Sequence, residues 1–205
     1  MKKNPFSAFV LPLAFILAIT FTTSSQADMG GKKFTQAPCT TKGNAKAQAA
    51  ILKSAQKQKY CVKLTEQLIL VVGSFTWDEA KNDAISQGGR LTGIRSQAEQ
   101  DILDSALPSV NYSDVWLGGI YRASNGHWVW DDSNVIFSTG NWDTGNFSLI
   151  SKVYSRWDAY EPNNPGTENC VSAVGWHIYY NATDDAMWNN LPCDWTLPGY
   201  LMRLP

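Results

Sequence analysis

Few features of a catalyst or of a nucleic-acid-binding protein occur in this 205-residue sequence. It has only two histidines, His127 and His177, and it lacks a Cys-x-x-Cys pair, a Gly-x-Ser-x-Gly elbow, a His-Glu-x-x-His motif and a phosphate-binding loop. No basic run occurs, and the formal net charge is −1. These absences argue against a zinc site, against an enzyme and against binding to nucleic acid.

Long hydrophobic runs are also missing. The apolar stretch from Phe9 to Phe21 is shorter than the roughly 18 to 20 residues that a membrane-spanning helix needs. It follows the basic start Met1-Lys2-Lys3 and precedes the small residues up to Ala27, which is typical of a secretory signal peptide. We therefore expect residues 1–27 to be removed, no membrane span in the mature chain, and a secreted or periplasmic location. The Lys-Lys start favours a bacterial source.

Cysteine is scarce but even in number. Cys39, Cys61, Cys170 and Cys193 occur in a chain expected to be exported, and an oxidising compartment favours disulfides over free thiols. Their count alone allows three pairings. Aromatic residues, in contrast, are abundant, with nine Trp, eight Tyr and eight Phe beside 15 Gly. This balance favours a loop-rich β protein with large side chains in its core.

The first half of the chain carries helix signals. We expect an N-terminal extension, residues 28–59, that is polar and irregular up to Pro38 and forms a short helix between about Ala47 and Ala55. A buried strand over Gln67 to Val72 should end at Gly73-Ser74. Two helices should then begin at capping boxes, Thr76 with Glu79 and Ser96 with Glu99, and the second helix should close at Pro108.

After Pro108 short apolar segments alternate with Gly, Asn, Asp and Pro. Two helices followed by many short strands predict an α+β fold. The stretch from Ser138 to Asn169 has no clear periodicity, yet it contains aromatic residues. A loop of this length in a compact domain is usually functional. Trp142, Phe147 and Tyr154 within it either pack the loop or extend a ligand groove, whereas Trp116, Trp128, Trp130 and Trp188 are expected in the core.

Several short motifs follow one another in a characteristic order along the chain. They are Thr76-Trp77 with Ala80, Gly88-Gly89-Arg90-Leu91, Ser96 with Glu99, Trp116-Leu117-Gly118, Trp128 with Trp130-Asp131-Asp132, Trp157, Glu161-Pro162-Asn163, Glu168-Asn169-Cys170-Val171, Trp188-Asn189-Asn190 and Cys193. Over residues 60–205 this order resembles the C-type lectin-like domain family. The resemblance implies two helices, two small antiparallel sheets and a long binding loop.

The resemblance also implies a disulfide framework. Cys170 would pair with Cys193 to staple the loop, and Cys39 would then pair with Cys61. A further bridge that is usual in the family would need cysteines near Ala84 and Met202. Both are absent, so apolar packing is expected to replace that link.

A calcium-dependent sugar site is the main functional implication of the resemblance. Carried over by motif, its residues are Glu161, Asn163, Glu168, Asn189 and Asn190, with a cis bond expected before Pro162. Carboxylate and amide oxygens suit Ca²⁺, and the first four side chains would also bind sugar hydroxyls. The Glu-Pro-Asn order resembles the type associated with mannose, N-acetylglucosamine and fucose. Asn190 departs from the family, because calcium-binding members have Asp there, and weaker calcium binding is expected.

Three other interpretations stay open. The segment from Glu161 to Gly166 also reads as a polar turn. Glu161 and Glu168 could be imagined as a glycosidase pair, although sequence shows neither their separation nor a raised pKa. The stronger rival is a calcium-independent protein-binding or adhesin-like module of the same fold. The expected partner is a glycan or a cell-surface glycoprotein, and a homo-oligomer would raise the avidity.

Overall fold

The computed structural model describes residues 26–29, 32–37, 39, 59–111, 113–175 and 187–205. The signal peptide before residue 26 and the helix expected between Ala47 and Ala55 lie outside the described residues. Within the described part, no helix is long and apolar enough to cross a membrane. Strand β1 (Gln26–Met29) crosses the expected cleavage point after Ala27, so a chain cut there would keep half of this strand.

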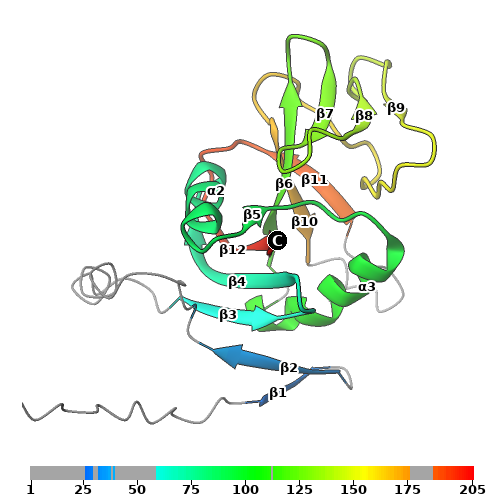
Figure 1. Ribbon diagram of the computed structural model, residues 1–205. Helices are drawn as coiled ribbons and strands as arrows, with labels where there is room; N and C mark the ends of the chain where they lie inside the picture. The colour runs from blue at the N-terminus through cyan, green and yellow to red at the C-terminus, as the bar shows by residue number, and fades with distance from the viewer. Residues whose placement is uncertain (1–25, 30–31, 38, 40–58, 112, 176–186) are drawn as a thin grey trace, which may run out of the picture.

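The last strand of the chain lies in the middle of the sheet. Strand β12 (Leu197–Arg203) pairs antiparallel with β4 (Leu68–Phe75) and with the short β5 (Arg90–Leu91). It also pairs in parallel with β6 (Val115–Arg122) through Tyr200 and Trp116. Strand β12 therefore joins the lower part of the molecule in Figure 1 to the upper part.

The lower sheet extends outward from β4. Strand β3 (Tyr60–Lys63) pairs with β4, β2 (Lys32–Ala37) pairs with β3, and β1 pairs with β2, all antiparallel (Figure 1). The prediction of an irregular segment from Asp28 to Pro38 was therefore wrong. Strand β2 gains backbone hydrogen bonds from β3, which follows the extension in sequence, and β1 pairs with β2 across the two residues Gly30-Gly31, a local hairpin signal.

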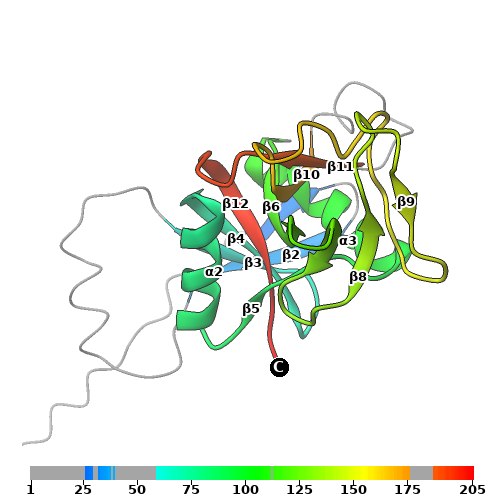
Figure 2. The ribbon, with the colours of Figure 1, turned by 90° about the horizontal axis from the view of Figure 1, so that it is seen from above.

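The upper sheet supports the long loop. Strand β6 pairs with β7 (His127–Trp130), which continues to β8 (Ile136–Thr139) and β9 (Ser148–Leu149). On its other edge β6 pairs with β10 (Cys170–Val174), and β10 forms an antiparallel pair with β11 (Met187–Leu191). Figure 2 shows β8 and β9 on the side of the molecule opposite helix α2. The stretch from Ser138 to Asn169 thus begins in β8, contains β9 and otherwise runs as loops and turns.

Both predicted helices form. Helix α2 (Trp77–Ser86) begins at a complete capping box, in which the Thr76 hydroxyl accepts from the Glu79 amide and the Glu79 carboxylate accepts from the Thr76 amide. Helix α3 (Gln97–Ala106) has only half of this arrangement. Ser96 accepts from the Glu99 amide, but the Glu99 carboxylate binds Arg203 and the backbone of Arg95 instead.

Two predicted ends differ from the structure. Strand β4 continues through Gly73 and Ser74 to Phe75, because β12 pairs with it as far as Phe75 and extends the ladder past the glycine. The second helix is followed by a 3-10 turn, η1 (Leu107–Val110), with Pro108 inside it. Proline is tolerated there because the first residues of such a turn need no amide donor.

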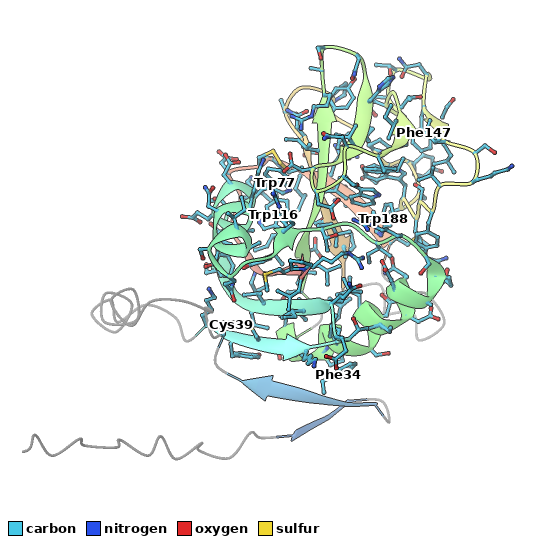
Figure 3. All side chains as sticks on the ribbon, in the orientation of Figure 1. Phe34, Cys39, Trp77, Trp116, Phe147 and Trp188 are labelled. Atoms are coloured by element: carbon cyan, nitrogen blue, oxygen red, sulfur yellow. A yellow bond between two sulfur atoms is a disulfide. The ribbon has the colours of Figure 1, made fainter. Side chains whose placement is uncertain are left out.

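The core contains the four tryptophans expected there, since Trp116, Trp128, Trp130 and Trp188 are at most 2% exposed. Trp130 stacks on Phe137 and meets Trp188 edge to face, with ring centroids 4.1 and 5.1 Å apart. Figure 3 shows Trp188 near the centre of the molecule and Trp116 beside α2. Trp188 belongs to β11, so the core reaches up to the strand that borders the long loop.

The missing disulfide is replaced by packing and by a polar network. Ala84 and Met202 are both buried in the same apolar cluster, as expected. Beside them, the buried Tyr200 hydroxyl donates to Asp83 over 2.6 Å and accepts from Gln87 over 2.9 Å. Lys59 pairs with the other oxygen of Asp83 at 2.6 Å. Helix α2 and strand β12 are thus joined without a covalent bond.

Candidate functional site

Both disulfides form with the implied pairing. Cys170 is bonded to Cys193 and Cys39 to Cys61, and no free cysteine occurs among the described residues. The first bridge connects the start of β10 to the segment after β11. It therefore fixes the end of the long loop, which Cys170 directly follows, against the segment after β11, while the second ties residue 39 to β3.

The Glu-Pro-Asn segment forms a tight reversal above the core. The bond between Glu161 and Pro162 is cis, as expected. The Asn163 side-chain amide donates to Glu161 over 2.8 Å, and the Asn163 backbone amide donates to the other Glu161 oxygen over 3.1 Å. These contacts turn the two functional side chains toward each other.

Asn190 holds this segment from below. Its buried side-chain NH2 donates to the backbone carbonyls of Asn163 and Glu168, each over 2.7 Å, and its oxygen accepts from the Asn163 amide over 3.0 Å. One side chain therefore joins both halves of the loop to strand β11. A carboxylate could not donate these two bonds, so the Asn that replaces the family's Asp has a structural use here.

Glu161 and Glu168 bring negative charge to the same place. Asn164 bridges Asn163 and Glu168, because its side-chain amide donates to the Asn163 side-chain oxygen over 2.6 Å and to Glu168 over 3.1 Å. Asn163 in turn donates to Glu161. Burial raises the pKa of Glu161 to about 8; the backbone hydrogen bond from Asn163 lowers it, and the charges of Glu168, Asp158 and Asp143 raise it. A bound cation would relieve this repulsion and favour the ionised form.

Asn189 stands apart from the other four residues. Side chains alternate along a strand, and Asn189 pairs with Ser172, so it lies on the opposite face of β11 from Asn190. Its side-chain oxygen and the Ser172 hydroxyl are both buried without a hydrogen-bond partner among the described residues. Glu161, Asn163, Glu168 and Asn190 are thus joined by hydrogen bonds, directly or through Asn164, and Asn189 does not join them.

The chemistry of this set suits a hard cation only in part. Its donors are all oxygens, which Ca²⁺ prefers, and two are carboxylates. No group of three or more His, Cys, Asp or Glu side chains is placed to hold a metal within the described part of the chain. Any ion bound here would therefore depend on amide oxygens, water or ligand hydroxyls.

A groove beside this site is lined by the aromatic residues of the long loop. Its volume is about 530 Å³, and Glu161 forms part of its wall together with Trp142, Phe147, Trp157 and Tyr160. Figure 3 shows Phe147 in the upper part of the molecule, above Trp188. The sequence offered the aromatic content of the loop as a signal, but not the position of the groove next to Glu161.

The comparison with known families agrees with this geometry. Residues 73–199, more than half of the chain, match the family model described as Lectin C-type domain. The chain belongs to the C-type lectin domain family. This family is one of lectin domains rather than of enzymes. The α+β fold expected from the sequence is confirmed, but the strands form one mixed sheet, joined by the parallel pairing of β12 with β6, where two antiparallel sheets were expected.

Two relatives of this C-type lectin domain come from animals. Ladderlectin of Oncorhynchus mykiss is 25% identical over 62% of this chain and 57% of the relative, and tetranectin of Mus musculus is 31% identical over 62% and 60%. The chain thus spans less than two thirds of these curated relatives. Their origin gives no support to the bacterial source that the Lys-Lys start favoured.

One solved structure similar to this chain comes from the cow. The cow CD23 carbohydrate-recognition domain, determined in the presence of GlcNAc2Man3 oligosaccharide, is 26% identical, with a TM-score of 0.48 over 68% of this chain and 88% of that one.

Proposed function

We propose that this chain is an exported lectin that binds glycans by coordinating adjacent sugar hydroxyls to a calcium ion. The convergence of Glu161, Asn163 and Glu168 around the buried Asn190 carries the proposal. Glu161, Asn163 and Glu168 would supply calcium ligands. Asn189, predicted as a fourth ligand, would have to turn from the opposite face of β11 to reach the ion, although its side-chain oxygen is buried without a hydrogen-bond partner among the described residues. Asn190 would act mainly by positioning, since its side chain is already engaged.

Selectivity would come from hydrogen bonding around the ion. A sugar hydroxyl can donate to a carboxylate such as Glu161 and accept from an amide such as Asn163. The Glu-Pro-Asn order supports ligands of the mannose, N-acetylglucosamine and fucose type. CD23, which belongs to the same family, was crystallised with an oligosaccharide that contains two of these sugars. The two disulfides fit an oxidising compartment, so a secreted or periplasmic lectin is the form we propose.

A second candidate is a calcium-independent protein-binding module. Asn190 favours it, because hydrogen bonds hold the loop in shape without an ion. The exposed aromatic side chains nearby could contact a protein as well as a sugar. Glu161 and Glu168 offer no sign of catalysis beyond the raised pKa of Glu161, which burial explains.

A glycan panel probed with and without EDTA separates the two candidates. We expect mannose-type ligands to bind in millimolar calcium and to be released by EDTA. Glu161→Gln combined with Asn163→Asp should weaken these ligands and admit galactose-type ones, because donors and acceptors around the ion exchange places. Glu66→Gln, at an exposed glutamate paired with Lys63, is the control and should change nothing. Binding that ignores EDTA, or unchanged selectivity in the double variant, would refute the site assignment.

A further inference from the structure

The groove beside Glu161 is built by a segment that the motifs of the sugar site do not include. Trp142 and Phe147 lie in the loop between β8 and β9, and Tyr160 directly precedes Glu161. Trp142 is 48% exposed and Tyr160 is 69% exposed, although apolar rings of this size are usually buried. Such exposure next to a proposed binding site calls for a ligand rather than for a role in the core.

The three rings form one aromatic wall. The Trp142 and Tyr160 rings meet edge to face with centroids 5.7 Å apart, and Trp142 lies 6.2 Å from Phe147. Tyr160 adopts a left-handed backbone conformation, with φ of 67°, which few residues other than glycine adopt. The strain of this conformation is tolerated where it aims the ring beside the Glu-Pro-Asn segment.

Two hydrogen bonds connect the wall to the proposed calcium site. The Trp142 backbone amide donates to the Pro162 carbonyl over 2.7 Å, and the Asn164 backbone amide donates to Asp143 over 2.7 Å. Residues 142–143 and 162–164 therefore form one unit. Glu161 belongs to both, because it lines the groove and is a predicted ligand of the ion.

The groove combines apolar and polar surface in the way that a pyranose ring does. Its aromatic wall can cover the C–H face of a sugar, while Arg156, Asp158 and Glu161 line the same groove and can bond hydroxyls. A ligand that continues from the ion into the groove would meet both kinds of surface without crossing a gap.

We infer that this groove is a second sugar subsite, which holds the next residue of an oligosaccharide whose first residue is bound at the calcium ion. The inference rests on the proposed function, because the calcium site fixes where the oligosaccharide begins. What the inference adds to the proposed function is that Trp142 and Tyr160 set the affinity for chains of two or more sugars but not the affinity for single sugars.

Calorimetry with methyl α-mannoside and with a mannose disaccharide, both in calcium, tests the subsite. Wild type should bind the disaccharide about fivefold more tightly, the order of one aromatic stacking contact. Trp142→Ala should abolish this advantage and leave the monosaccharide affinity within about twofold. Trp142 joins Pro162 through its backbone, so the alanine variant keeps that bond. Trp195→Ala, at a tryptophan that is 55% exposed and outside the groove, is the matched control and should alter neither affinity.

The outcomes separate the subsite from the proposed function. Equal affinity of wild type for both sugars overturns the subsite and leaves the calcium site standing, whereas no binding of either sugar overturns both. A Trp142→Ala variant that loses both affinities equally also overturns the subsite, because the ring would then belong to the first site. If that variant does not fold, Tyr160→Ala provides the same test, since alanine meets the same backbone strain and removes only the ring.

Discussion

In the base of the domain and in the long loop, one buried polar side chain connects separate segments by hydrogen bonds. The two regions differ in whether the carboxylates nearby have a cationic partner. At the base, Tyr200 connects β12 to α2, and the Asp83 carboxylate that it contacts is paired with Lys59. In the loop, Asn190 connects β11 to two segments, yet Glu161 and Glu168 have no ion pair within the described part of the chain. At the base the carboxylate already has a cationic partner, whereas in the loop burial raises the pKa of Glu161 and no cationic side chain of the described residues compensates its charge; a bound cation would favour its ionised form.

Removing each disulfide in turn gives the largest effect and compares the two regions directly. The bridges span 22 and 23 residues, so the entropy model predicts nearly the same loss, about 3 kcal/mol of unfolding free energy for each. Cys170→Ala with Cys193→Ala should in addition weaken calcium binding, whereas Cys39→Ala with Cys61→Ala should not. Urea unfolding and calcium titration of both double variants measure this. Equal weakening of calcium binding would show that the loop has no special dependence on its own bridge.

Asn190→Asp replaces the side chain that connects the loop to β11 by the residue that the family resemblance implies for calcium-binding members. In EDTA we expect a loss of about 2 kcal/mol, because two donated hydrogen bonds disappear and a negative charge is added near Glu161 and Glu168. In millimolar calcium the variant should gain more in melting temperature than wild type does, since binding to the folded state stabilises it.

Asn190→Leu separates the two effects in the same assay. It loses the hydrogen bonds but adds no charge, so calcium should not restore its stability. If Asn190→Asp were as stable as wild type in EDTA, or gained no more than wild type from calcium, the role assigned to this amide would be wrong.

Tyr200→Phe gives the smallest effect and tests the base. The loss of the hydroxyl should cost about 1 kcal/mol at neutral pH, because Asp83 keeps its bonds to Lys59 and Gln87. Burial, and then the Asp83 charge, raise the pKa of Tyr200 above its ordinary value of 10.0. The folded protein therefore holds the phenol proton more tightly than the unfolded chain does. This contribution to stability is full below pH 10 and is lost as the pH rises above it.

Urea unfolding of wild type and Tyr200→Phe between pH 8 and pH 11 follows this loss. The stability difference between the two proteins should narrow above pH 10. A constant difference would mean that Tyr200 does not couple folding to alkaline pH.

Local signals in the sequence predicted local structure well. The Thr76 and Glu79 capping box and the start of α3 depend on residues three apart, and both were correct. Glu99 shows the limit of this reasoning. Its carboxylate leaves the capping pattern for Arg203, which lies 104 residues away and reaches it only after β12 has joined the sheet.

In the site, too, contacts between residues close in sequence were predicted and contacts between distant residues were not. The motifs predicted the cis bond before Pro162 and the closeness of Glu161 to Asn163. The use of the Asn190 amide could not be predicted, because its partners lie 27 and 22 residues away on two different parts of the loop. A ligand groove formed by loop aromatics was one of two alternatives from the sequence, but its place beside Glu161 could not be predicted, since the contact of Trp142 with Pro162 is a backbone bond that no side-chain pattern encodes.

The central place of β12 has a consequence for how the protein is made. This strand comprises residues 197–203 and pairs with β4, β5 and β6, so until it is synthesised no strand of the described part pairs with both halves of the sheet. A nascent chain that ends before Leu197 lacks the strand around which the others close, and it exposes apolar edges. The complete sheet can therefore form only after residues 197–203 have been synthesised, although they come last among its strands.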